Sequence, residues 1–231
     1  MKRFLQKNEI YFTTIAATLL SIMAIVVSVI ACTISYSQYQ NDKYDKKPDF
    51  QIQKEIRINP LTNYYEDTYL IISKLSGKAK NISINTISFI DVKMNASEKE
   101  TKHKRFALYN YFETSFISGI NEGILQTTTG YKNNLKIIDF TNSLDSILSL
   151  NNQTIVNIQT ETYVKISFLD FKQKHNTEYF QVDTFQGNII NNIGGEKLFE
   201  EHKTLTETEK TIQLNFINEM DLSKIIKMVE N

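Results

Sequence analysis

The sequence predicts a mainly β fold: an antiparallel β-sandwich or barrel-like domain, residues 50–231, preceded by one N-terminal transmembrane helix. Two observations carry this prediction. An uncharged apolar stretch of helical length lies near the N-terminus. Seven to nine short segments of strand character follow it, with few helical segments between them. Hydrophobic residues make up 41% of the 231 residues, with 14 Phe and 12 Tyr, which excludes a disordered chain.

Charge and cysteine content restrict the classes of partner and cofactor. The 26 basic residues balance the 26 acidic ones, so no overall field draws in nucleic acid. Only three basic residues are arginine, the usual bidentate ligand of guanine and phosphate. A single cysteine excludes an intrachain disulfide and a multi-cysteine zinc site. We therefore expect no nucleic-acid partner, no metal and no cofactor.

The N-terminal part divides into a basic leader (1–11), a transmembrane helix (12–36) and a juxtamembrane linker (37–49). No charged residue lies between Glu9 and Asp42, and the apolar centre, residues 15–34, has the roughly 20 residues that a bilayer core requires. Aromatic residues at both ends of the stretch suit the headgroup regions. Pro48 disfavours helix at the preceding residue, so any extension of the helix should end there.

Cleavage of this segment is the alternative to an anchor. Val29-Ile30-Ala31-Cys32 resembles a bacterial lipobox, in which Cys32 is the candidate lipidation site. However, the apolar stretch before Cys32 exceeds the roughly 7–15 residues of a signal-peptide apolar region, and it continues past the cysteine. We expect an uncleaved anchor, with a lipoprotein as the alternative. Both place the rest of the chain at a membrane.

The charges that flank the helix barely indicate on which side of the membrane the β-domain lies. Three basic residues precede the helix (Lys2, Arg3 and Lys7) and three follow it closely (Lys43, Lys46 and Lys47), so the positive-inside rule finds little asymmetry. A short basic leader before a first helix usually stays cytoplasmic, which favours an extracytoplasmic domain. The excess of Lys over Arg and the abundance of Ile and Asn indicate a bacterial source. We expect a single-pass protein of the bacterial cytoplasmic membrane.

One face of the predicted helix carries a stripe of small residues at alternating spacings of three and four: Thr14, Ala17, Ser21, Ala24, Ser28, Ala31 and Ser35. This is the period of a left-handed helix pair. Small residues let backbones approach closely, and packing drives helix association in lipid. The stripe predicts self-association or docking on another membrane helix.

Beyond the linker, the first strands are marked by alternation. Apolar residues alternate with polar ones over 50–58, with Lys54 as the exception, and residues 65–74 and 82–92 are the next strands. We expect a polar loop at 95–105. Short strands are expected at 106–112 and 135–140.

The C-terminal half is predicted to contain a hairpin and a terminal helix. A capped helical turn is expected at 141–148, followed by a hairpin of 163–171 and 179–185 around the turn 172–176. Gly194-Gly195 should break the chain. A last strand is expected at 211–217 and a short amphipathic helix at 222–229.

No sequence motif indicates catalysis. The histidines His103, His175 and His202 lie in polar segments without a metal-ligand spacing. Glu200-Glu201-His202 could place a carboxylate beside an imidazole, but adjacent side chains diverge, and we expect this run to be solvated surface. Lys102, Lys104 and Arg105 form a local basic patch, interpreted mainly as a solvated loop, with contact to anionic lipid or cell-wall polymer as the alternative. A catalytic pair of carboxylates that are distant from each other in the sequence stays an open alternative.

Residues 15–92 resemble a broad class of uncharacterised bacterial single-pass membrane proteins. The resemblance rests on the membrane helix, the polar Gln/Lys segment, a Lys-Pro-x-aromatic strand start, and a pattern of Ile, Gly, Ala and Asn residues over 72–84. It implies a β-sandwich on a membrane anchor, on either side of the membrane, and carries over no activity or site residue.

These observations predict a non-enzymatic, membrane-tethered interaction module. It would associate through its helix and bind a protein or envelope ligand through an exposed edge or loop of the β-domain. Two alternatives stay open: a membrane-bound hydrolase with dispersed carboxylates, and a lipoprotein that is lipidated at Cys32 and binds an envelope ligand.

Overall fold

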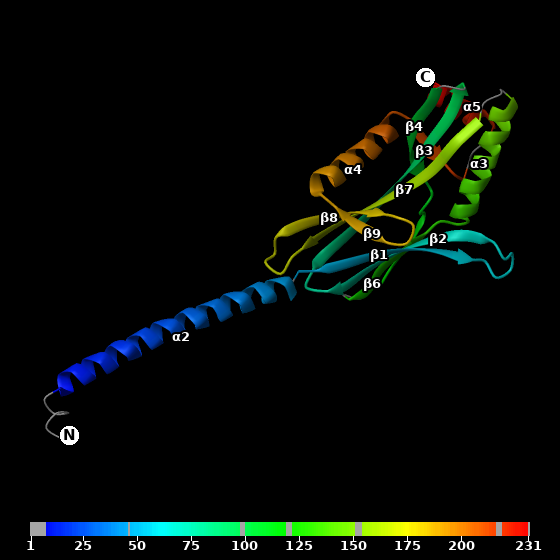
Figure 1. Cartoon of the computed structure of the whole chain (residues 1–231). Coiled ribbons are helices and arrows are strands. Elements are labelled where there is room, and N and C mark those ends of the chain that lie inside the picture. The colour runs from blue at the N-terminus through cyan, green and yellow to red at the C-terminus, as the bar shows by residue number, and fades with distance from the viewer. Residues whose placement is uncertain are drawn as a thin grey trace. The chain divides into compact units, whose positions relative to one another are not determined.

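The computed structural model describes residues 8–45, 47–97, 100–118, 122–150, 154–215 and 219–230. The chain divides into two compact units, residues 1–47 and residues 48–231. The first contains helix α2 and the second contains the β-rich domain (Figure 1). Leader residues 1–7 and Lys46 lie outside the described residues.

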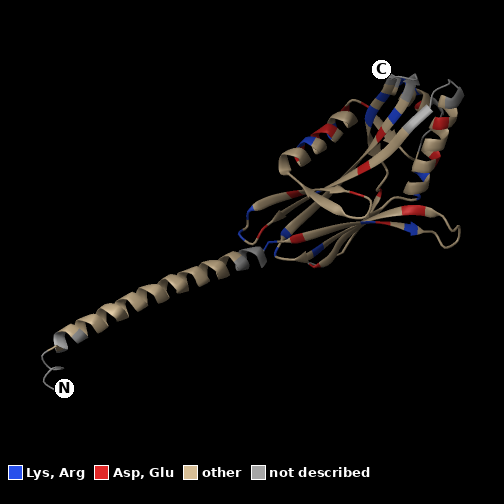
Figure 2. Cartoon of the chain, in the orientation of Figure 1, with Lys and Arg blue, Asp and Glu red and all other residues tan. Residues whose placement is uncertain are grey.

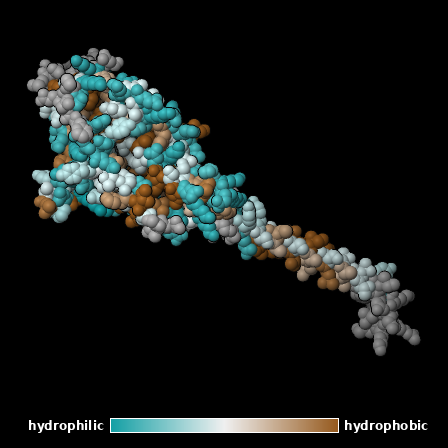
Figure 3. All heavy atoms as spheres, turned by 180° about the vertical axis from the view of Figure 1, so that it is seen from behind, coloured by the Kyte–Doolittle hydropathy of each residue, from teal (hydrophilic) through white to brown (hydrophobic). Residues whose placement is uncertain are grey.

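Helix α2 (Glu9–Asp45) forms the first unit. Its segment Thr13–Gln40 is long and apolar enough to cross a membrane, and none of it is buried against protein. Its ribbon carries no charged residue between its grey ends (Figure 2), and large apolar side chains are exposed along it (Figure 3). The helix continues through residues 37–45, which the sequence predicted as linker, and ends before Pro48.

The second unit contains two sheets. In the four-stranded sheet the order is β1 (Asp49–Ile58), β2 (Tyr65–Ser76), β6 (Gly123–Thr129) and β5 (Thr114–Ile117). In the six-stranded sheet the order is β10 (Thr211–Gln213), β4 (Glu100–Tyr109), β3 (Lys80–Ser97), β7 (Thr154–Leu169), β8 (His175–Val182) and β9 (Gly187–Ile190). All pairs are antiparallel except β10 with β4. The predicted mainly β fold after one apolar helix is therefore confirmed, as two sheets and not one closed barrel in the described chain.

The inner face of the six-stranded sheet is covered by two different partners. One half packs on the four-stranded sheet, and this cluster includes Ile52, Leu70, Val164 and Phe180. The other half packs on α3 (Asn133–Leu150) and α5 (Glu219–Glu230). Helix α4 (Asn192–Glu207) instead contacts β3, β4 and β8, and a smaller apolar cluster of β3, β7 and α4 residues lies there.

Several predicted elements are confirmed. Strands β1, β2 and β3 contain the predicted segments, and β7 and β8 form the predicted hairpin, with Leu169 opposite His175. Helix α5 contains the predicted 222–229. The predicted strand 211–217 is reduced to β10, and residues 216–217 lie outside the described chain.

The prediction of a strand at 135–140 is wrong, because these residues belong to α3. Phe140, Leu144 and Leu148 lie four residues apart, and all three are buried in the core. Because this helical period continues for more than two turns, it outweighs the local β-branched residues that favour a strand. The predicted helical turn at 141–148 is part of the same helix.

The prediction of a polar loop at 95–105 is also wrong, because β3 continues to Ser97 and β4 begins at Glu100. Arg105 and His103 of β4 are tolerated in the sheet because both contact Asp91 across the strand pair. The predicted break at Gly194-Gly195 is wrong as well, since both glycines lie in α4.

Candidate functional site

Arg105 is the centre of an ion cluster on the six-stranded sheet, which we call the Arg105 cluster. Arg105 lies opposite Asp91 across β3 and β4. Its Nε donates to Asp91 Oδ1 at 3.1 Å, and its Nη2 donates to Asp91 Oδ2 at 3.0 Å and to Glu161 Oε2 of β7 at 2.9 Å. A bidentate carboxylate pair of this kind is strong and geometrically specific. The cluster therefore ties three strands together.

Further groups complete the Arg105 cluster. His103 Nε2 lies 2.9 Å from Asp91 Oδ1, and Tyr163 donates its hydroxyl to Glu161 at 2.8 Å. Glu201 of α4 lies 3.7 Å from the guanidinium. Hydrogen bonding to Asp91 raises the pKa of Arg105, and burial, followed by Glu161, raises the pKa of Tyr163. The carboxylates are thus held by a permanent cation, which suits a structural role better than acid–base chemistry.

The predicted basic patch is divided by the strand on which it lies. Because side chains alternate along a strand, Arg105 is on the opposite face of β4 from Lys102 and Lys104. Acidic residues balance the charge of Arg105. The structure therefore separates Arg105 from the two lysines.

The structure differs from the prediction of solvated surface at His202. His175 and His103 are both exposed, and His103 also contacts Asp91 of the Arg105 cluster. His202 on α4 is partly buried, its ring centroid 5.3 Å from that of Phe89, and its Nε2 is buried without a hydrogen-bond partner. Burial lowers the pKa of His202, and the backbone of Ser88 partly offsets this. Pattern reasoning missed these roles because the partners come from distant strands.

The predicted stripe on α2 is exposed along the helix, as is Cys32. Ser21 donates its hydroxyl to the Ala17 carbonyl at 2.9 Å, and Ser28 to the Ala24 carbonyl at 2.8 Å. Both serine hydroxyls therefore have a hydrogen-bond acceptor within their own helix. Ala24, Ser28 and Cys32 also line a shallow hollow on this helix.

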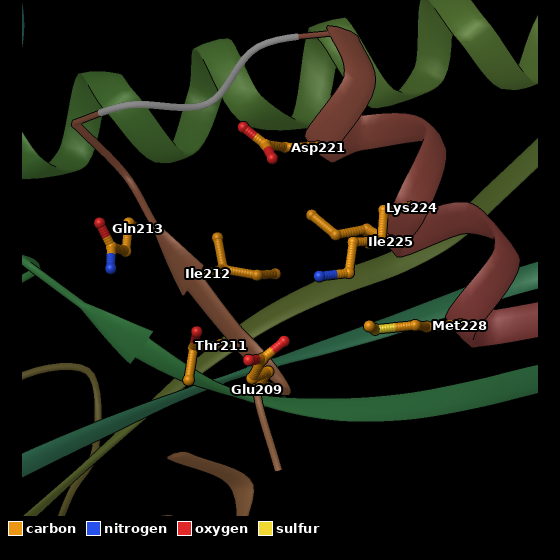
Figure 4. A pocket seen from close by; sticks show the side chains of 8 residues that line it. All are labelled: Glu209, Thr211, Ile212, Gln213, Asp221, Lys224, Ile225 and Met228. Carbon is orange, nitrogen blue, oxygen red and sulfur yellow. The ribbon is translucent and has the colours of Figure 1, made fainter. Parts of the chain in front are cut away.

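A groove of about 350 Å³ lies between β10 and α5, and we call it the β10–α5 groove (Figure 4). Its apolar lining comes from Ile212 of β10 and from Ile225 and Met228 of α5. The α5 helix presents these residues because apolar positions recur at helical spacing, with Leu222 and Ile226 also packed into the core. Strand β10 thus forms one side of the groove, and helix α5 forms the other.

The β10 side of the groove is an edge of the six-stranded sheet. In the described chain β10 pairs with β4 alone, and Ala107 donates its amide to the Lys210 carbonyl at 3.0 Å. In this parallel register the backbone of Ile212 bonds to β4, so the amides and carbonyls of Thr211 and Gln213 point away from it. Both residues line the groove. The groove therefore offers backbone hydrogen-bonding groups to an incoming strand.

Charged side chains border the β10–α5 groove. Lys224 extends toward Ile212, and Glu209 and Asp221 lie on either side of it (Figure 4). Lys224 makes no hydrogen bond or ion pair with another described residue. Its ammonium is the group at the groove that is free to take an acidic partner.

The described residues contain no group of three or more His, Cys, Asp or Glu side chains placed to hold a metal ion. The fold and the groove define the class: a β-domain that follows an apolar helix and presents a strand–helix groove. No protein-family model, curated protein or solved structure matches the chain.

Proposed function

We propose that this protein is a single-pass protein of the bacterial cytoplasmic membrane, with a non-enzymatic β-domain that binds an extended segment of a partner protein in the β10–α5 groove. The observation that carries the proposal is the free edge of β10 opposite α5. An extended peptide adds to such an edge through its main chain, and the flanking groove receives alternate side chains.

The groove supplies each part of this recognition. Thr211 and Gln213 provide the main-chain donors and acceptors, and the apolar lining accepts one side chain of the peptide. Lys224 provides charge complementarity to an acidic side chain nearby. Helix α2 keeps the domain at the membrane, which raises its effective concentration toward a membrane-bound partner.

A peptide-library experiment tests this function. Random peptides are selected on the full chain in detergent micelles, and amide hydrogen exchange is measured with and without a selected peptide. We expect slower exchange at Thr211 and Gln213, because a bound strand would bond to their amides. Selected peptides that bind without protecting either amide would show that the proposed groove is wrong.

Two variants sharpen the experiment. Gln213→Pro removes an edge donor that β4 does not use, and we expect it to weaken peptide binding at least tenfold. Lys224→Glu should abolish a preference for an acidic side chain at the peptide position beside residue 224. Lys203→Glu on the exposed part of α4 is the matched charge control and should change neither result.

A further inference from the structure

A second cleft, of about 590 Å³, lies where β1 leaves the core of the β-domain. We call it the Lys54 cleft. It is lined by residues 54–57 of β1 and by Tyr65, Asn134 and Phe185. None of these residues lines the β10–α5 groove or belongs to the Arg105 cluster. The cleft is therefore a separate feature of the domain.

The alternation of β1 explains why the cleft is apolar and open. Phe50 and Ile52 face the core and are buried, and Lys54 and Ile56 continue the same side of the strand. The Lys54 amide donates to the Phe185 carbonyl at 2.9 Å, which fixes the β8–β9 connection beside the strand. Ile56 is 40% and Phe185 73% exposed, so both apolar side chains lack a full partner in the described chain.

The charges of the Lys54 cleft do not cancel. Arg57 and Glu55 pair with each other at 2.9 Å. Lys54 forms no ion pair or side-chain hydrogen bond with another described residue, and burial lowers the pKa of its ammonium. Asn134 is the second residue of the 18-residue helix α3, whose N-terminal end carries a partial positive charge. The cleft thus has a net positive charge in partly desolvated surroundings.

We propose that the Lys54 cleft binds a small organic anion, an aromatic or other flat apolar body that carries one carboxylate. The carboxylate pairs with the Lys54 ammonium, and the apolar body packs on Phe185 and Ile56. A desolvated, unpaired cation is costly, and a bound carboxylate offsets that cost. The volume lies within the range of small-molecule sites.

The test uses 4-fluorobenzoate as the probe, observed by ¹⁹F line broadening on the full chain in uncharged detergent micelles, with empty micelles subtracted. We expect saturable binding that weakens at least tenfold in Lys54→Met and in Phe185→Ala. Fluoroacetate, which lacks the ring, and 4-fluorobenzyl alcohol, which lacks the charge, should each bind at least tenfold more weakly than 4-fluorobenzoate.

Lys172→Met is the matched control, because Lys172 is also a lysine beside a phenylalanine, 5.5 Å from the ring of Phe171, but it is exposed. Its affinity for 4-fluorobenzoate should equal that of the wild type. Circular dichroism verifies the fold of each variant, and Lys54→Met should keep it because the ammonium forms no ion pair or side-chain hydrogen bond with another described residue. Unchanged binding in folded Lys54→Met, equal loss in Lys172→Met, or no saturable binding to the wild type would overturn the proposal, while the peptide experiment on β10 would be unaffected.

Discussion

Gly195 lets α4 lie directly on the six-stranded sheet. A Cβ atom at this position would be 2.2 Å from Cγ of Tyr179, far inside van der Waals contact. The neighbouring Gly194 has only the Asn191 side chain near its own Cβ position, at 3.1 Å. The contact with Tyr179 therefore leaves no room for a side chain at Gly195, whereas the nearest neighbour of a Cβ atom at Gly194 is the Asn191 side chain.

We expect Gly195→Ala to lower the free energy of unfolding by about 1–3 kcal/mol, because the added methyl group overpacks the contact with Tyr179. Gly194→Ala is the control and should change it by less than about 1 kcal/mol, since alanine also favours the helix. Urea unfolding of the full chain in micelles, followed by tyrosine circular dichroism, measures both. Equal losses of unfolding free energy in Gly195→Ala and Gly194→Ala would contradict a close contact between Gly195 and Tyr179.

We expect His202 to make the stability of the folded domain depend on pH. Burial lowers its pKa below 6.5, so the neutral ring is the form that the folded state favours. The associated stability is complete above pH 6.5 and is lost as the pH falls below it, with a slope of at most about 1.4 kcal/mol per pH unit for one proton. Glu201 and the Arg105 guanidinium, 5.0 Å from the Phe89 ring centroid, are the charged groups near this contact.

Comparison with His202→Gln checks this pH dependence. Glutamine does not titrate, so the variant should lose less stability than the wild type between pH 7.5 and 5.5, as measured by urea unfolding. His175→Gln replaces an exposed histidine and should follow the wild-type curve. If the free energy of unfolding of the wild type and of His202→Gln changes equally with pH, the prediction that the buried His202 ring is neutral is wrong.

At the scale of elements, pattern length decides what the sequence can predict. Strand β1 alternates over ten residues, and that signal alone identified it. The first half of α3 looked like a strand because four to six residues cannot separate a buried strand from a helix. The Arg105 cluster was out of reach, since Asp91 and Glu161 are 14 and 56 residues away and meet only through the register of β3, β4 and β7.

The stripe on α2 yields a prediction at this scale. Replacing Ser21, Ala24 and Ser28 together with Leu should abolish helix association in a membrane two-hybrid assay, because the larger side chains hold the backbones apart. The control replaces Met23, Val26 and Ile30 with Leu on the other faces, which leaves the stripe intact. A signal that survives the first triple change, or is lost in the second, would contradict association through the stripe.

At the scale of the whole molecule, the net charge of zero is the sum of opposite net charges on the two units. Residues 1–47 carry a net charge of +3 and residues 48–231 a net charge of −3. The apolar surface is divided as well: α2 exposes it along its length, whereas most of the large apolar side chains of the β-domain lie in its cores. This division supports a helix adapted to lipid and a domain adapted to water.

Cys32→Ser tests the two proposed modes of membrane attachment, the α2 anchor and lipidation at Cys32. If α2 itself is the anchor, the variant stays in the membrane fraction after carbonate extraction, because Thr13–Gln40 retains its length and hydropathy. Intact mass spectrometry of the wild type should then show the unlipidated chain, including residues 1–31. Loss of those residues, with a lipid on Cys32 and release of the Cys32→Ser variant, would replace the anchor by a lipoprotein.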